Sequence, residues 1–286
     1  MPRMITVAAI QMSCSDKTDQ NIQKADLMVR TAADQGAQII LLPELFETLY
    51  FCQEKAEANF RYAASLEQQQ AVAHFQEVAR ELQVVLPISF FEHTEKHYFN
   101  SIAIVNANGQ ILGIYRKTHI PDGPGYEEKF YFSPGDTGFQ VWDTRYGKLG
   151  VGICWDQWFP EAARCMALQG AEFLLYPTAI GSEPGLEKVD SKEHWQLCMQ
   201  GHAAANIMPV IAANRTGTEK AAASELTFFG SSFITNEIGR KISEADRTSE
   251  TIVYGSFDLQ QIRCYRDFWG VYPDRKPGMY RRLVEP

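Results

Sequence analysis

The stretch KLGVGICWDQWFPE, residues 148–161, is the most informative part of the chain. A short apolar run with two glycines ends at Cys154, and a helical pattern begins after the tryptophan-rich turn. A strand, a sharp turn and a helix in this order present the side chain at the turn at a sheet edge, beside free backbone N–H groups. A cysteine is ordinarily a small buried hydrophobic residue, but this position favours Cys154 as a nucleophile.

Outside this stretch, apolar runs of strand length alternate with amphipathic segments of helical period. Helices are expected over residues 18–35, 68–82, 160–169 and 190–206. Strands are expected over residues 5–11, 38–43, 84–91, 98–106, 111–116, 148–153, 172–177, 210–213, 228–235 and 251–257. Asn108-Gly109 lies between two of these strands and predicts a hairpin. The alternation indicates an α/β fold with a mixed sheet.

No linker-like or repeated segment divides the chain, so we expect one domain over residues 1–286. Both halves use the same order of strand and helix, which suits two sheets packed face to face between helices. The tail from about residue 272, which begins YPDRKPGMY, is rich in proline and polar residues. We expect this tail to be extended and to lie on a partner subunit.

The composition is that of an ordinary globular protein, with 45% apolar and 22% charged residues. No apolar stretch approaches the roughly 20 residues of a membrane-spanning helix, and residues 1–12 indicate a buried strand rather than a signal peptide. The six cysteines lack metal-ligand spacing, which indicates free thiols in a reducing cytoplasm. A net charge of −8 without a basic stripe argues against nucleic-acid binding and is compatible with a small cationic substrate.

Two further candidates stand at the ends of strand-like runs, although each taken alone is more often a solvated residue. In IILLPELFE, residues 39–47, Glu44 follows four apolar residues and a proline, and a half-buried glutamate is suited to act as a general base for a thiol. Glu47 is the competing candidate. In GIYRKTHIP, residues 113–121, Lys117 ends a strand. Its charge would stabilise an oxyanion about 4 Å away by about 4 kcal/mol at an effective dielectric near 20.

Together these segments resemble the Glu–Lys–Cys triad of the nitrilase superfamily of carbon–nitrogen hydrolases. FSPGD (residues 132–136), YPTA (176–179), ANR (213–215) and FGSS (229–232) match as well, so the resemblance extends from about residue 5 to residue 280. It implies a four-layer αββα sandwich with two mixed sheets between helices. It also implies a homodimer or larger homo-oligomer, and no metal or organic cofactor.

Longer matches over residues 44–52, 115–126, 154–161 and 176–184 resemble the branch that hydrolyses carbamoyl amines. The implied reaction converts N-carbamoylputrescine to putrescine, carbon dioxide and ammonia. True nitrilases carry Cys-Trp-Glu at the turn, whereas this chain has Cys154-Trp155-Asp156, which disfavours a nitrile substrate. The alternative within this class is an amidase acting on another carbamoyl amine or an aliphatic amide.

The resemblance also implies roles for individual residues. Cys154 would attack the ureido carbon, Glu44 would take its proton, and Lys117 and the N–H of Trp155 would hold the oxyanion. The family has a second glutamate near the nucleophile. Glu128 is its best match here, and the neighbouring Glu127 stays as an alternative.

A carbamoylated diamine has one cationic end, so its pocket should contain acidic or aromatic groups. Glu183, in the loop after the expected strand 172–177, is the first candidate for the cation, and a solvated loop residue is its ordinary interpretation. The other residues expected at the substrate are Tyr50, Tyr126, Trp155, Trp158 and Ala179, of which the first three offer cation–π or apolar contacts worth roughly 0.5–2 kcal/mol each.

Two other classes of function stay open. A papain-like enzyme would pair the cysteine with a histidine, and His119 is the histidine near a motif. Activity that collapses when His119 is replaced, with Glu44 kept, would indicate that class. A non-catalytic interaction protein on the same fold is the second alternative, and it is disfavoured because all three triad positions carry reactive residue types.

Overall fold

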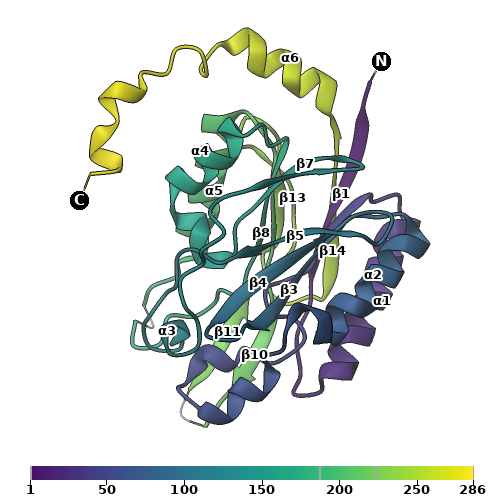
Figure 1. Cartoon of the computed structure of the whole chain (residues 1–286), viewed down its shortest axis with the longest axis vertical. Helices are drawn as coiled ribbons and strands as arrows, with labels where there is room; N and C mark the ends of the chain where they lie inside the picture. The colour runs from purple at the N-terminus through teal and green to yellow at the C-terminus, as the bar shows by residue number, and fades with distance from the viewer. Residues whose placement is uncertain (1, 187, 223, 286) are drawn as a thin grey trace.

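Two mixed β-sheets pack face to face at the centre of this computed structural model, which describes residues 2–186, 188–222 and 224–285 (Figure 1). The first sheet has the order β14 (Thr251–Asp258), β1 (Met4–Gln11), β2 (Ile39–Leu41), β3 (Leu86–His93), β4 (Tyr98–Val105) and β5 (Ile111–Arg116). A parallel bridge between Ile39 and Val85 joins its two halves. The second sheet has the order β13 (Lys241–Glu244), β12 (Phe233–Thr235), β9 (Val210–Ala213), β8 (Phe173–Pro177), β7 (Gly147–Val151) and β6 (Val141–Thr144).

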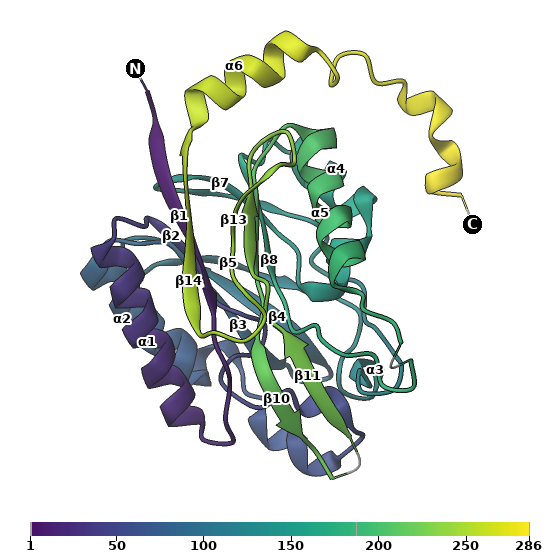
Figure 2. The same ribbon diagram turned by 180° about the vertical axis from the view of Figure 1, so that it is seen from behind.

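A pair of helices covers the outer face of each sheet, as the two opposite views show (Figures 1 and 2). The first pair is α1 (Thr18–Asp34) and α2 (Gln70–Leu82), and the second pair is α4 (Pro160–Leu168) and α5 (Lys192–Asn206). Because apolar residues recur every three or four positions, each helix presents one apolar stripe to its sheet. The order helix, sheet, sheet, helix confirms the αββα sandwich.

The central strands are buried on both faces, which explains their nearly continuous apolar sequence. In β1, Val7 and Ala9 pack between the sheets, whereas Ala8 and Ile10 pack beneath the helices. Successive side chains of a strand point to opposite faces, so a layer that is covered on both sides needs apolar residues at every position.

The expected strand over residues 228–235 is wrong as a single element. Gly230 and Ser231 have left-handed backbone conformations, with φ of 52° and 57°, and interrupt the strand. The first part belongs to β11 (Glu225–Phe229), which pairs with β10 (Thr216–Lys220) in a separate hairpin, and the second part is β12. The polar sequence of β10 had not predicted a strand.

Beyond β14 the chain runs along one end of the molecule, where Arg266 and Tyr272 donate hydrogen bonds to carbonyl oxygens of the body, and the tail that follows extends away from it (Figures 1 and 2). The side chain of Asp258 accepts hydrogen bonds from the N–H groups of two glutamines and starts α6 (Leu259–Trp269), a helix that was not predicted. The tail that follows has two short 3-10 helices, Pro277–Met279 and Arg281–Leu283. Its contact with a partner subunit remains a prediction. Among the described residues, no helix has the length and apolar character needed to cross a bilayer.

Several strands end at one edge of the sandwich, and the candidate site lies there. β7, β8 and β9 run parallel, so their carboxyl ends share an edge. β5 runs parallel to β2 because β2 to β5 connect through one parallel and two antiparallel pairings. Glu44 follows β2, Lys117 follows β5 and Cys154 follows β7.

Candidate active site

Cys154 lies at a strained turn between β7 and α4. It opens the 3-10 helix η4 (Cys154–Trp158) with a φ of 41°, which is unfavourable for a residue other than glycine. Its Sγ lies 3.9 Å from the carbonyl oxygen of Ala179. Burial raises the pKa of the Cys154 thiol well above its usual range, the charge of Glu44 raises it further, and Lys117 opposes them. The resting thiol is therefore protonated, and a nucleophilic role requires a base.

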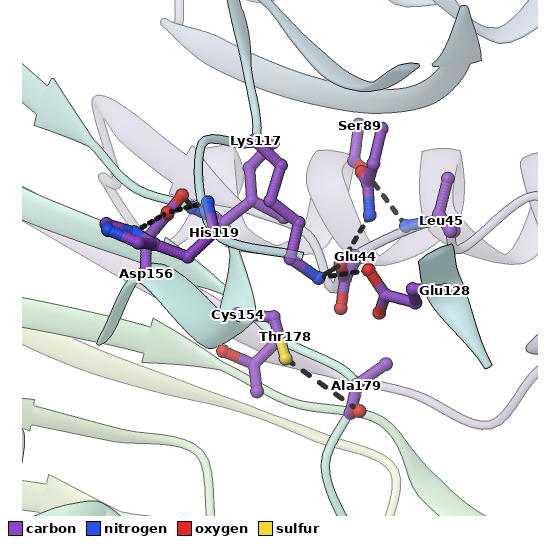
Figure 3. A network of polar contacts seen from close by, with 12 residues as sticks. Glu44, Leu45, Ser89, Lys117, His119, Glu128, Cys154, Asp156, Thr178 and Ala179 are labelled. Carbon is purple, nitrogen blue, oxygen red and sulfur yellow. Dashed lines mark hydrogen bonds and ion pairs between the residues drawn. The ribbon is translucent and has the colours of Figure 1, made fainter. Parts of the chain in front are cut away.

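Lys117 lies between two buried carboxylates (Figure 3). Its Nζ donates to Oε1 of Glu44 at 2.8 Å and to Oε2 of Glu128 at 2.6 Å, and the three side chains are fully buried. Burial opposes the charge of Lys117, but Glu128 and Glu44 raise its pKa well above its usual range. The lysine is therefore a fixed positive charge, because buried ions persist where they are paired and hydrogen-bonded.

Glu44 is held through both its side chain and its backbone. Asn100, on β4, donates from Nδ2 to Glu44 Oε1 at 2.6 Å, and Glu44 Oε2 has no hydrogen-bond partner among the described residues. Arg215, which follows β9, donates to the carbonyl oxygens of Glu44, Leu45 and Thr48. The guanidinium thus fixes the loop that presents the carboxylate.

Glu128 begins α3 (Glu128–Tyr131) and completes the cluster. The hydroxyl of Tyr50 donates to its Oε1 at 2.6 Å. Burial and the charge of Glu44 raise the pKa of Glu128 to about 7, and Lys117 opposes them. Glu127 turns away and pairs with Lys55 at 2.9 Å. Of the two neighbouring glutamates, the structure places Glu128 at the cluster.

A buried aspartate, which sequence reasoning had not selected, braces the turn. Asp156 Oδ2 accepts from the N–H of Ile153 at 2.9 Å and from the hydroxyl of Tyr115 at 2.7 Å. Its Oδ1 accepts from the N–H of His119 at 3.0 Å and lies 2.7 Å from His119 Nδ1. One carboxylate therefore ties the turn at Cys154 to the segment that follows Lys117. Among the described residues His119 makes no hydrogen bond to Cys154, whose Sγ contacts the carbonyl oxygen of Ala179 instead, so the geometry gives the Cys–His alternative no support.

A cavity of about 500 Å³ opens in front of the thiol. Seven of the expected residues line it: Tyr126, Glu128, Cys154, Trp155, Trp158, Ala179 and Glu183. Glu44, Lys117 and Tyr50 are not among its lining residues. Lys117 and Tyr50 contact Glu128, which does line the cavity, so Tyr50 is not at the substrate position expected for it. Asp122 is a further acidic residue of the lining, beside Glu128 and Glu183, and no lysine or arginine is present among the described residues that line the cavity.

Glu47, the competing candidate for the base, is at a different place. It lines a second cavity of about 300 Å³, on the side of the loop where α1 and α2 begin, and neither Cys154 nor Lys117 lines that cavity. Burial raises the pKa of Glu47 to about 8. The arrangement around the thiol therefore does not include it. Within the described part of the chain, no three histidine, cysteine or carboxylate side chains are grouped as metal ligands.

Comparison with known proteins identifies the family. The sequence profile described as carbon–nitrogen hydrolase matches residues 6–267. The chain is 51% identical to an N-carbamoylputrescine amidase of Arabidopsis thaliana, with 99% of this chain and 96% of that protein covered. It is 52% identical to a citrullinase of Francisella tularensis, with 98% of each covered. A carbon–nitrogen hydrolase structure from Helicobacter pylori, 38% identical, has a TM-score of 0.91 over 99% of both chains. This chain belongs to the nitrilase superfamily of carbon–nitrogen hydrolases.

Proposed function

We propose that this carbon–nitrogen hydrolase cleaves the ureido group of N-carbamoylputrescine, releasing putrescine, carbon dioxide and ammonia. The observation that carries the proposal is the charge of the cavity, whose lining includes Asp122 and Glu183 and, among the described residues, no lysine or arginine. A ligand with a cationic end and no anionic group suits such a cavity. Sequence identity alone does not distinguish N-carbamoylputrescine from citrulline as the substrate, because the amidase and the citrullinase are about equally similar to this chain.

The two candidate substrates differ by a single group. Citrulline carries a carboxylate on the terminal carbon that bears the ammonium group, and N-carbamoylputrescine carries hydrogen there. Citrulline therefore needs a partner for its carboxylate, since an unpaired charge is costly to desolvate. Beside Glu183 and Asp122 the carboxylate would instead meet charges of its own sign, whereas the ammonium group would be stabilised.

Glu183 is held at a defined place in the cavity wall. The hydroxyl of Ser191 donates to its Oε1 at 2.8 Å. Tyr126 fixes the preceding residues, because its hydroxyl accepts from the N–H of Gly181 at 3.0 Å and donates to the carbonyl oxygen of Ser182 at 3.1 Å. Tyr126 thus supports the loop of Glu183 in addition to lining the cavity.

In the proposed reaction Cys154 Sγ attacks the ureido carbon while Glu44 takes the thiol proton. The oxyanion is stabilised by Lys117 and by the N–H of Trp155, which lies in the first turn of η4, where backbone N–H groups lack acceptors within the helix. Glu44 returns the proton to the departing nitrogen. Water activated by Glu44 then cleaves the S-carbamoyl group from Cys154, and the carbamic acid that is released decomposes to carbon dioxide and the second nitrogen product.

Three substrates of similar chain length test the proposal: N-carbamoylputrescine, L-citrulline and N-butylurea, which lacks both charged groups. We expect kcat/KM for N-carbamoylputrescine to exceed that for N-butylurea by a factor of about 30 to 150, the equivalent of about 2–3 kcal/mol for a charged hydrogen bond. Glu183→Gln should raise KM for N-carbamoylputrescine and leave N-butylurea unchanged. Glu193→Gln, on the exposed first turn of α5, is the matched control. Faster turnover of citrulline than of N-carbamoylputrescine would refute the proposal.

A further inference from the structure

We propose that Asn100 is a positioning residue that makes Oε2 the oxygen of Glu44 that accepts the thiol proton. The inference rests on the proposed role of Glu44 as the base, and it adds which oxygen acts and what selects it. Asn100 lies in β4, between Phe99 and Ser101, and its side chain is buried. No motif of the sequence had indicated it.

The two carboxylate oxygens of Glu44 have different surroundings. Oε1 accepts from Lys117 Nζ at 2.8 Å and from Asn100 Nδ2 at 2.6 Å. Oε2 is buried and has no partner among the described residues. An oxygen that already accepts two donors has its lone pairs engaged, whereas a free oxygen can accept a proton. The hydrogen bonds therefore assign the proton transfer to Oε2.

Asn100 also fixes Lys117, through its backbone. The carbonyl oxygen of Asn100 accepts from the N–H of Lys117 at 2.8 Å, and Asn100 pairs with Phe91 in the ladder between β3 and β4. A single residue in a central strand therefore holds the carboxylate by its side chain and the lysine by its main chain. A rigid strand gives the base the orientation that proton transfer requires.

An amide suits this position because it donates without adding charge. The charged or titratable groups that act on Glu44 are Lys117 after β5, Glu128 on α3, Cys154 on η4, Tyr50 and Cys52 in the loop after β2, and Arg215 after β9. A second cation would hold the carboxylate more strongly and weaken it as a base, and a carboxylate would repel it. The neutral Nδ2 donor orients Glu44 and leaves its charge unchanged.

The test uses two variants of Asn100 and a matched control. Asn206 on α5 is also buried, donates from Nδ2 to one carbonyl oxygen and has an unpartnered Oδ1, but it lies outside the site. Asn100→Ala should lower kcat by about 10- to 100-fold with KM within about threefold, since general-base catalysis contributes factors of this order or larger. The rate of Cys154 alkylation by iodoacetamide should fall in parallel. Asn206→Ala should lower the melting temperature without changing either rate.

Asn100→Asp keeps the shape of the side chain, so it provides a second test if the alanine variant does not fold. The introduced carboxyl group donates a hydrogen bond only when it is protonated. The ratio of its kcat/KM to that of the wild type should therefore rise as the pH falls from about 9 to about 6. A ratio that is independent of pH, or an alanine variant with wild-type kcat and alkylation rate, would overturn the inference. Glu44→Gln separates the two proposals. An active Glu44→Gln enzyme would contradict the role of Glu44 as the base. An inactive Glu44→Gln enzyme together with a fully active Asn100→Ala enzyme would contradict only the positioning role of Asn100.

Discussion

Replacing Glu128 by glutamine should raise the free energy of unfolding of the protein at alkaline pH. In the native state burial raises the pKa of this carboxyl group to about 7, from an ordinary value of 4.5. Between these two values the folded protein binds more protons at this group than the unfolded chain does. The contribution of Glu128 to the free energy of unfolding is therefore fully present below about pH 4.5 and is lost as the pH rises toward 7. The separation of about 2.5 pH units corresponds to about 3 kcal/mol at 1.36 kcal/mol per unit.

Glutamine has the shape of the protonated acid and cannot ionise. The variant should therefore match the wild type near pH 5 and exceed its free energy of unfolding by about 3 kcal/mol above pH 7. Urea unfolding at pH 5, 6, 7 and 8, followed by circular dichroism, measures this difference. Glu127→Gln is the control, because that side chain is partly exposed and pairs with Lys55 at the surface. If the difference in the free energy of unfolding between Glu128→Gln and the wild type stays constant with pH, or favours the wild type at pH 8, then the buried cluster does not raise the pKa of Glu128.

Two further outcomes are expected. Cys154→Ala should abolish ammonia release and leave the circular dichroism spectrum unchanged. The control Cys165→Ala, at an exposed position on α4, should retain activity. More than a few per cent of wild-type activity in Cys154→Ala would contradict the assignment of Cys154 as the nucleophile. Lys117→Met should reduce kcat at least about 100-fold and destabilise the fold by about 3–5 kcal/mol, since it leaves the buried carboxylates of Glu44 and Glu128 without their cation. A free energy of unfolding of Lys117→Met equal to that of the wild type would contradict the claim that Lys117 stabilises the two buried carboxylates.

The layers of the fold were predictable because they depend on local patterns. The helix expected over residues 18–35 is α1 (Thr18–Asp34), since a stripe of apolar residues identifies the face that is buried. By contrast, β10 (Thr216–Lys220) was missed because only its pairing with β11 makes it a strand. α6 was missed although Leu259, Ile262 and Tyr265 recur at helical spacing, and the sequence offers no reason for the omission.

The three candidate residues were selected for a different reason. Glu44, Lys117 and Cys154 each follow a strand directly or after a short loop, but the first two are more often solvated at such positions, and the resemblance of their segments to one family singled them out. Asn100 and Asp156 act through partners that are distant in the chain, 56 positions away for Glu44 and 37 positions away for His119. Nothing next to Asn100 or Asp156 in the sequence shows which loop will face it, because register and sheet packing determine those contacts.

The charges of the site limit which groups can move protons. The raised pKa of Lys117 keeps it charged throughout the working range of pH, so it serves as an electrostatic partner and cannot act as an acid. The raised pKa of Cys154 keeps the thiol neutral until a base accepts its proton. Glu128 is occupied by Lys117 and Tyr50, which leaves Oε2 of Glu44 as the free carboxylate oxygen of the cluster. In the proposed mechanism the proton taken from the thiol and the proton given to the departing nitrogen would therefore pass through one oxygen atom, and the surrounding strands would have to maintain the orientation of that carboxylate.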